Sequence, residues 1–230
     1  GVENVALGFL AGFTGQALES GLQKAGIRSD FIWLQTGMTR VNVKIKSGLE
    51  TEINNPGPAI PPQALEGLFQ KLDQLRPGDI IVLAGSIPDP HPEEIYRRLF
   101  TRLEGRGVLA VVDAAGKLLR TVLPFHPFLI KPNLQELGDL FGERLESKNR
   151  TEILNRAKQL QAWGAQNVLV SMAGDGSLLL DGDGGSHWLG VPPGTVRNSV
   201  GAGDSMVAGF LAGWLRDGSY NTAHRMGAAA

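Results

Sequence analysis

A glycine-rich turn followed by a single acid lies near the end of the 230-residue chain. It spans Asn198–Met206, with the sequence Asn-Ser-Val-Gly-Ala-Gly-Asp-Ser-Met. An apolar helical stripe follows it, formed by Val207, Phe210, Leu211, Trp214 and Leu215. Glycines let backbone N–H groups crowd around a small anion, and the free donors and positive dipole end of a helix N-terminus favour negative charge there. The turn therefore predicts a phosphate-sized anion site at the start of a buried helix.

Asp204 is the residue of this turn that an anion site alone does not explain. A carboxylate beside a bound phosphate costs repulsion. Asp204 therefore either caps the helix or accepts the proton of a hydroxyl that attacks the phosphate. Taken alone, the motif favours the cap, so the rest of the chain must decide between the two roles.

Polar or glycine-rich segments also follow other predicted strands, at the edge where open α/β sheets bind ligands. Lys131–Glu136 places Asn133 and Glu136 three residues apart, on one side of a helix start. The pair fits a capping box, and its oxygens would also suit waters around Mg²⁺. In Ser171–Gly176 a tight turn explains the glycines, and the position also suits a nucleotide's phosphates or ribose. Asp113–Lys117 follows a third strand.

Short apolar runs alternate with amphipathic helical patterns along the chain. Strands are predicted at 5–9, 79–84, 108–113, 128–131 and 167–172. Helices are predicted from Thr14, as N-cap, to residue 24 and at 62–75, 92–103, 135–141, 151–163 and 204–215. The runs Ile80–Ala84 and Val108–Val112 are typical of central strands buried on both faces. The pattern predicts an α/β fold with a mostly parallel sheet flanked by helices.

Residues 28–54 interrupt this series, because no helix is predicted there. Apolar residues alternate with polar ones in this stretch, which predicts a two-faced strand over Arg40–Lys46. Its polar face offers cationic and amide groups to an anionic ligand, although a solvated outer face is the simpler interpretation. The interruption of the βα series and the stiff turn Asn54–Pro58 favour a lid with a hinge.

Composition narrows the function classes. The formal net charge of −1 argues against nucleic acid or an anionic membrane as the main partner. The absence of cysteine excludes disulfides, thiolate metal sites and a cysteine nucleophile, and it fits a cytoplasmic protein. The apolar segment 5–13 is too short to span a bilayer, and no basic residue precedes it as in a signal peptide.

Several other catalytic motifs are missing from the sequence. It contains neither the G-x-x-x-x-G-K-[ST] of P-loop kinases nor the G-x-S-x-G of serine hydrolases. The dinucleotide-binding fingerprint needs Gly or Ala where this turn has Met206. The four histidines, His91, His126, His187 and His224, are scattered and suggest neither a metal cluster nor a triad.

Four motifs together resemble those of the PfkB-type, ribokinase-like carbohydrate kinases. They are Val200–Met206 with Gly-Ala-Gly-Asp-Ser-Met, Lys131–Glu136 with Asn-x-x-Glu, Thr39–Ile45, and the strand end Gly85–Pro88. The resemblance covers nearly the whole chain and is strongest to the branch of 1-phosphofructokinases and tagatose-6-phosphate kinases. It implies a ribokinase-like three-layer α/β/α fold, with the kinase domain at 1–27 and 55–230 and a small β-sheet lid at 28–54.

The resemblance also implies roles for single residues and the cofactors ATP and Mg²⁺. Asp204 matches the family's catalytic base, and the backbone of Gly201, Ala202 and Gly203 matches its anion hole. The residues that match ATP contacts are Ser171, Met172, Ala173, Gly174, Asp175, Gly176 and Gly203. Asn133 and Glu136 match residues that organise Mg²⁺ through water, and Arg40, Asn42 and Lys44 match lid residues near the sugar phosphate.

The sequence departs from the family at both ends. Relatives begin earlier, with a strand that bears a substrate-binding Asp and with a Gly-Gly-Lys-Gly segment over the sugar, and neither is present here. Residues 227–230 stop inside what resembles a helix lining the adenine pocket. We therefore expect an incomplete copy that lacks part of the acceptor site.

The implied function is ATP-dependent phosphorylation of a sugar phosphate. Fructose 1-phosphate is the favoured acceptor, because residues 39–58 resemble the 1-phosphofructokinase branch more closely. A tagatose-6-phosphate kinase and a non-catalytic nucleotide or sugar-phosphate binding protein remain alternatives. Lid strands of relatives often pair two subunits, so a homodimer through the lid is also an expectation.

Overall fold

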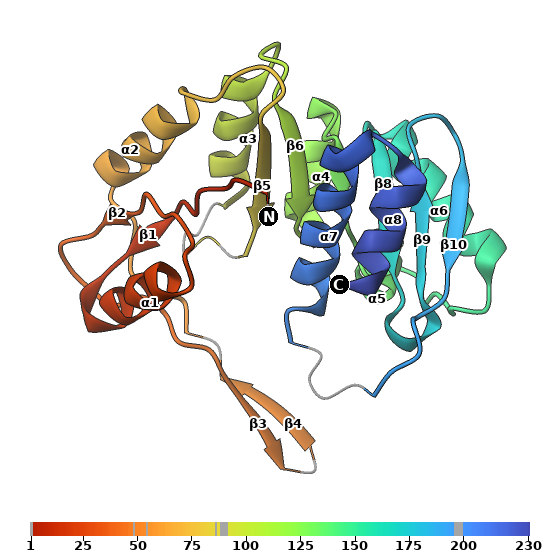
Figure 1. The fold of residues 1–230 in the computed structure, drawn as a ribbon, viewed down its shortest axis with the longest axis horizontal. Coiled ribbons are helices and arrows are strands. Elements are labelled where there is room, and N and C mark those ends of the chain that lie inside the picture. The colour runs from red at the N-terminus through yellow and green to blue at the C-terminus, as the bar shows by residue number, and fades with distance from the viewer. Residues whose placement is uncertain (1, 48, 54, 86, 88–91, 196–199) are drawn as a thin grey trace. The chain divides into compact units, whose positions relative to one another are not determined.

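A computed structural model describes the chain except residues 1, 48, 54, 86, 88–91 and 196–199. The chain divides into two compact units, whose elements are labelled in Figure 1. The smaller unit comprises Gly1–Leu75 and Ser86–Pro92, and the larger comprises Arg76–Gly85 and Glu93–Ala230.

The smaller unit contains a short parallel strand pair, two helices and a β-ribbon. The parallel pair is β1 (Phe9–Leu10) and β2 (Ile32–Trp33), with α1 (Gly12–Lys24) between them in the chain. The second helix is α2 (Pro62–Leu72). The ribbon pairs β3 (Val43–Ser47) antiparallel to β4 (Leu49–Ile53). The ribbon falls within 28–54, and its role as a lid remains a prediction.

Several details of the smaller unit differ from the sequence expectation: for example, the strand predicted at 5–9 is observed at Phe9–Leu10. Helix α1 has Ala11 at its N-cap, so Thr14 lies inside the helix, where its hydroxyl donates to the carbonyl of Thr39 at 2.8 Å. Thr14 was mistaken for a cap because this long-range bond cannot be seen in the local sequence. The predicted strand over Arg40–Lys46 begins only at Val43.

The larger unit is built on a six-stranded sheet with the order β10-β9-β8-β7-β6-β5. The strands are β5 (Ile80–Ala84), β6 (Leu109–Asp113), β7 (Leu129–Ile130), β8 (Asn167–Ser171), β9 (Ser177–Leu180) and β10 (Ser186–Leu189). β5 to β8 run parallel, and β9 pairs antiparallel with both β8 and β10. The expected mostly parallel sheet is confirmed.

Helices cover both faces of this sheet, which gives the expected three-layer α/β/α arrangement. In Figure 1, α7 and α8 lie in front of the sheet and the other helices of the larger unit lie behind it. The front layer is α7 (Ala202–Asp217) and α8 (Tyr220–Ala229). The remaining helices are α3 (Pro92–Leu103), α4 (Gly116–Val122), α5 (Leu134–Phe141) and α6 (Arg150–Ala162), with short 3₁₀ turns at Leu123–Phe125 and Ala173–Asp175.

One core cluster lies between the sheet and the front helices. Its buried residues come from four central strands or their ends and from both front helices: Val111, Phe128, Leu129, Leu169, Leu179, Val207, Phe210 and Ala223. Burial of these side chains favours folding of this unit. Because the core fixes α7 against the sheet, it also fixes the glycine-rich turn at the start of α7.

Two expectations about packing were wrong. Ile80–Ala84 forms an edge strand rather than a central one, and Val82 is 45% exposed. An apolar run indicates a strand, but position in the sheet depends on pairing with distant strands. In the helical stripe, Leu215 is 51% exposed, whereas Val207 and Phe210 are buried. Within the described residues, no helix is long and apolar enough to cross a membrane.

Candidate active site

The glycine-rich turn forms the N-terminus of α7, as the sequence predicts. Gly201 is the N-cap and adopts a left-handed conformation, with φ of 79°, which favours glycine. Among the described residues, no side chain caps this terminus, so the first-turn N–H groups at Ala202–Asp204 keep their capacity to bind an anion. The preceding Asn198 and Ser199 lie outside the described residues.

Asp204 lies in the first turn of α7 and is exposed. It sits three residues beyond the N-cap, so its carboxylate is not in the capping position. Of the two roles that the sequence left open, the cap is therefore the poorer fit. An exposed carboxylate beside free backbone donors is placed to meet a hydroxyl that approaches a bound phosphate.

A buried ion pair lies directly beside this turn. Lys131 follows β7 and Asp113 ends the neighbouring β6, so parallel pairing brings their side chains to one edge of the sheet. Lys131 Nζ is 3.2 Å from Asp113 Oδ1, and the lysine side chain is only 6% exposed. A Cβ added at Gly203 would lie 2.9 Å from the same ammonium, so a larger residue at this position would have to displace the lysine side chain.

Tyr96 of α3 is electrostatically coupled to the same carboxylate. It is 3% exposed, and burial together with the negative charge of Asp113 raises its pKa above 10.0. Tyr96 therefore remains a neutral phenol beside the ion pair at physiological pH. Sequence reasoning placed Asp113 and Lys131 in segments at the ligand-binding edge of the sheet but gave neither a role, and it did not single out Tyr96. The available signal was that Asp113 and Lys131 each follow a predicted parallel strand.

Asn133 and Glu136 form a complete capping box at the start of α5. The backbone N–H of Asn133 donates to Glu136 Oε2 at 2.8 Å, and the backbone N–H of Glu136 donates to Asn133 Oδ1 at 2.8 Å. The predicted cap is confirmed. Each oxygen used in the cap keeps a second lone pair, and Glu136 has a further carboxylate oxygen, so the pair can still hold waters of a hydrated cation.

Direct metal ligation has less support. Among the described residues, no group of three or more His, Asp or Glu side chains could hold a metal ion. The oxygen donors at Asn133 and Glu136 therefore fit Mg²⁺ held through water better than a protein cage.

The segment Ser171–Gly176 forms a compact loop between β8 and β9. The backbone N–H of Ser171 donates to the carbonyl of Pro132 at 3.1 Å, which ties the start of the loop to the Asn133 segment. Ala173 has a left-handed φ of 47°, unusual for a residue other than glycine. Gly176 is buried, and a Cβ there would lie 2.0 Å from the carbonyl oxygen of Leu189. Packing explains Gly176, whereas Ala173–Asp175 are exposed and available to a ligand.

Within the larger unit, the structure thus brings together the turn before Asp204, the segment Lys131–Glu136 and the loop Ser171–Gly176. Lys131 contacts the turn before Asp204, and Ser171 pairs with Asn133. Arg40 and Asn42 belong to the smaller unit, where both are exposed ahead of β3, and Lys44 lies in β3. Their place beside the sugar phosphate remains a prediction. Within the motif Gly85–Pro88, Ser86 and Pro88 lie outside the described residues.

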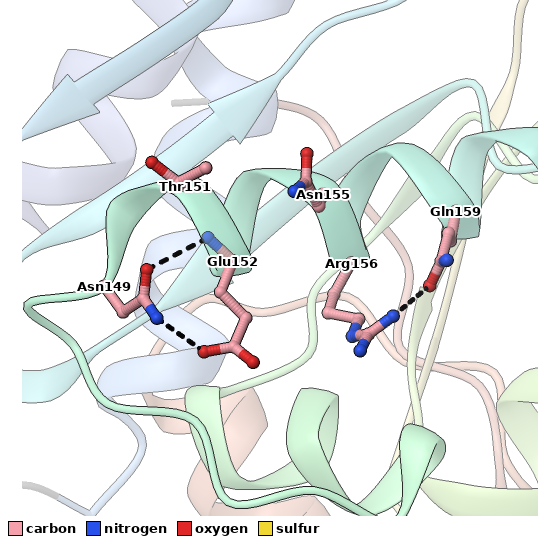
Figure 2. A pocket seen from close by; sticks show the side chains of 6 residues that line it. All are labelled: Asn149, Thr151, Glu152, Asn155, Arg156 and Gln159. Carbon is pink, nitrogen blue, oxygen red and sulfur yellow. Dashed lines mark hydrogen bonds between the residues drawn. The ribbon is translucent and has the colours of Figure 1, made fainter.

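A separate hollow on α6 does not belong to this site. It is lined by polar side chains of one helix and its N-cap, namely Asn149, Thr151, Glu152, Asn155, Arg156 and Gln159 (Figure 2). Asn149 caps the helix through Glu152, and Arg156 pairs with Glu143. The cation that lines the hollow is thus already paired, and the hollow contains no nucleophile or base placed beside an anion site.

Comparison with known proteins supports the same chemistry. The family model described as "pfkB family carbohydrate kinase" matches residues 1–230. The chain is 41% identical to a 1-phosphofructokinase of Bacillus subtilis over 226 residues, which cover 98% of the chain and 73% of that protein. It is 36% identical to a D-tagatose-1-phosphate kinase of Bacillus licheniformis over 211 residues, covering 92% of the chain and 68% of that protein.

A solved structure has the same fold. The phosphofructokinase-2 of Escherichia coli in complex with substrates and products superimposes with a TM-score of 0.90 at 26% identity. The match covers 98% of this chain and 74% of that one. A ribokinase-like fold is therefore confirmed.

Proposed function

The chain belongs to the pfkB family of carbohydrate kinases, and we propose that it transfers the γ-phosphoryl group of ATP to fructose 1-phosphate. The products would be ADP and fructose 1,6-bisphosphate. The observation that carries this proposal is the N-terminus of α7, which no described side chain caps, with a buried cation beside it and an exposed carboxylate in its first turn. The 41% identity to a 1-phosphofructokinase supports the choice of acceptor.

Asp204 is the proposed general base. It accepts the proton of the sugar's free primary hydroxyl as that oxygen attacks the γ-phosphorus, and the bond from phosphorus to the bridging oxygen of ADP breaks. An aspartate with a pKa of about 3.9 is ionised at neutral pH but is a weak base. Positioning and charge stabilisation must therefore supply most of the rate acceleration.

The backbone of Gly201–Gly203 and the ammonium of Lys131 are the proposed source of that charge stabilisation. Free N–H groups and the positive end of α7 favour the negative charge that spreads over the phosphoryl oxygens. Lys131 adds a full positive charge beside Gly203, and Asp113 fixes the orientation of the lysine. Because these groups are held by the folded sheet, they need little reorganisation during transfer.

ATP is the phosphoryl donor that membership of a kinase family implies. We propose that the exposed backbone of Ala173–Asp175 contacts the nucleotide and that Gly203 contacts its phosphates. Asn133 and Glu136 would hold the water shell of Mg²⁺, which supplies neutralisation of the phosphate charge when it is bound with ATP.

The smaller unit would bind the acceptor. Arg40, Asn42 and Lys44 are proposed to hold the phosphate already on the sugar, as a charged handle remote from the reacting hydroxyl. Residues 28–54 would then act as a lid. Val43, Ile45 and Ile53 are about half exposed and lie on one face of the β3–β4 ribbon, so the ribbon is the proposed contact of a homodimer in the cytoplasm.

A second acceptor also has support. The relative named D-tagatose-1-phosphate kinase shares 36% identity, and its acceptor carries the phosphate at the same end as fructose 1-phosphate. The two sugars differ in the configuration of one hydroxyl, so the same lid cations and the same base would serve both. Tagatose 6-phosphate, whose phosphate lies at the opposite end, stays an alternative.

Release of ADP from ATP and Mg²⁺ tests the proposal. Separate assays would use fructose 1-phosphate, tagatose 1-phosphate, tagatose 6-phosphate, fructose 6-phosphate and unphosphorylated fructose. We expect the highest kcat/KM with fructose 1-phosphate. Preference for a tagatose phosphate would keep the mechanism and change the acceptor. Nucleotide binding without turnover on any acceptor would instead indicate a binding protein.

A further inference from the structure

A buried histidine that the proposed reaction does not use lies behind the nucleotide loop. His224 of α8 is 1% exposed, and its Nε2 atom is 2.8 Å from Oγ of Ser177. Ser177 is also 1% exposed and opens β9. This side-chain hydrogen bond joins α8 to β9, the strand that follows the loop.

Ser177 is directly connected to the proposed nucleotide loop. It follows Gly176, the last residue of Ser171–Gly176. Gly176 is clamped against Leu189, and its carbonyl accepts the N–H of Met172 at 2.9 Å, which closes the loop. A displacement of Ser177 would therefore also displace the backbone of the loop.

On its other side, His224 is fixed to the helix that carries Asp204. Helices α7 and α8 pack with almost no space between their backbones. A Cβ at Gly213 would lie 2.6 Å from Cα of Ala223, and one at Gly227 would lie 2.8 Å from the carbonyl oxygen of Met206. Because Ala223 precedes His224, the histidine belongs to a rigid helix pair whose N-terminal end is the Asp204 turn.

A histidine at this position costs more folding stability than a purely structural contact requires. Its Nδ1 atom is buried and has no hydrogen-bond partner among the described residues. An unsatisfied buried polar atom costs stability, whereas replacing both partners of a buried hydrogen bond by apolar groups of similar shape is close to neutral or stabilising. Residues that break a local rule at a stability cost are often found at functional sites.

We propose that His224 is a positioning residue, which holds the nucleotide loop at a fixed distance from Asp204 through its hydrogen bond to Ser177. This rests on the proposed function, since it takes Ser171–Gly176 as the nucleotide loop and Asp204 as the base. The bond restrains the loop before ATP arrives, so less ordering remains to be done on binding. Loss of the bond weakens nucleotide binding without removing any group that touches the nucleotide.

The double variant Ser177→Ala with His224→Leu tests the proposal, because it removes both polar partners and leaves neither unpaired. Isothermal titration with ATP and Mg²⁺ gives the Kd, and thermal unfolding gives the Tm. We expect the Kd to rise about fivefold, the factor that corresponds to one ordinary hydrogen bond. The Tm is expected to equal or exceed that of the unsubstituted chain. A merely structural contact would leave the Kd unchanged, whatever the Tm of the double variant.

Two single variants add a geometric test. His224→Gln places an amide group where Nε2 now lies, so it should restore the bond to Ser177 and the original Kd. His224→Asn reaches only as far as Nδ1 and should behave like the double variant. Tyr220→Phe is the matched control, since it removes a polar contact to Asn167 from the same helix and should leave the Kd unchanged.

The outcomes separate this proposal from the proposed function. Equal Kd values in the unsubstituted chain and the double variant overturn the positioning role alone. The expected Kd pattern without turnover on any sugar phosphate supports the positioning role and overturns the proposed reaction. A chain that binds no ATP overturns both.

Discussion

The ammonium of Lys131 lies against Gly203, where an added Cβ would come within 2.9 Å of its nitrogen. A buried cation at the N-terminus of a helix is unfavourable for stability, because the helix dipole is positive at that end. Asp113 offsets the charge only in part, and buried ion pairs contribute little net stability. The arrangement becomes favourable when an anion binds, which is the property that a phosphoryl-transfer site needs.

Gly203→Ala should disturb this contact directly. The new methyl group would displace the ammonium of Lys131 or shift the first turn of α7. Turnover should therefore fall on the order of tenfold to a hundredfold, as expected for a misplaced catalytic group. Gly21→Ala is the control, because its Cβ would meet no described atom within 4 Å. Equal turnover in both variants would show that the Gly203 contact is unimportant.

Glu136→Gln should separate the capping role of Glu136 from its proposed role near Mg²⁺. The amide oxygen can still accept the N–H of Asn133, so the Tm should change little. The Mg²⁺ concentration that gives half-maximal turnover should rise several-fold, because the negative charge is lost. Glu152→Gln at the similar cap of α6 serves as control. A normal Mg²⁺ dependence of turnover in Glu136→Gln would show that Asn133 and Glu136 serve only to cap α5.

Stability should fall in mild acid because of His224. Burial, together with the nearby His187 of β10, lowers the pKa of His224 from 6.5 to about 4. As the pH falls below 6.5, His224 is protonated in the unfolded chain but stays neutral in the folded chain. The free energy of unfolding therefore decreases between pH 6.5 and 4, whereas His224 has no effect on it above pH 6.5. The loss should reach about 3 kcal/mol at pH 4.

Urea unfolding at several pH values measures this loss. His224→Gln has no titrating group at this position, so its free energy of unfolding should depend less steeply on pH over the same range. Identical pH dependence in the two proteins would contradict the assignment.

Arg40→Ala should weaken sugar-phosphate binding without affecting the nucleotide. Loss of one charge-assisted hydrogen bond should raise the KM for fructose 1-phosphate about tenfold to a hundredfold. Lys24→Ala removes another exposed cation of the same unit and should have no effect. If the KM for ATP rises instead, the residue does not bind the acceptor.

Local pattern was enough to predict most of the helices. α3 was predicted to the residue, and α6 within one residue at each end, because apolar periodicity and capping residues are local signals. β9 and β10 were not predicted, since four-residue strands acquire their identity only by pairing, β9 with β8 and β10 with β9. The edge position of β5 was missed for the same reason.

The parts of the candidate site that are local in sequence could be predicted, and the contacts between distant segments could not. The turn before Asp204 and the cap at Asn133 are contiguous in sequence, so spacing alone identified them. The contact of Lys131 with Asp113 and Gly203 joins three separate segments, and only the register of the sheet reveals it. His224 gave no signal, because a single histidine in an amphipathic helix has no distinguishing pattern.

Replacement of Asp204 by Asn tests the central claim most directly. The amide keeps the shape of the side chain and cannot accept the proton of the sugar hydroxyl. We predict that turnover with fructose 1-phosphate falls about 10²- to 10⁴-fold, the usual contribution of a general base, while the Kd for ATP is retained. Asp217→Asn, at the other end of α7, should keep normal turnover. Near-normal turnover in Asp204→Asn would contradict the account.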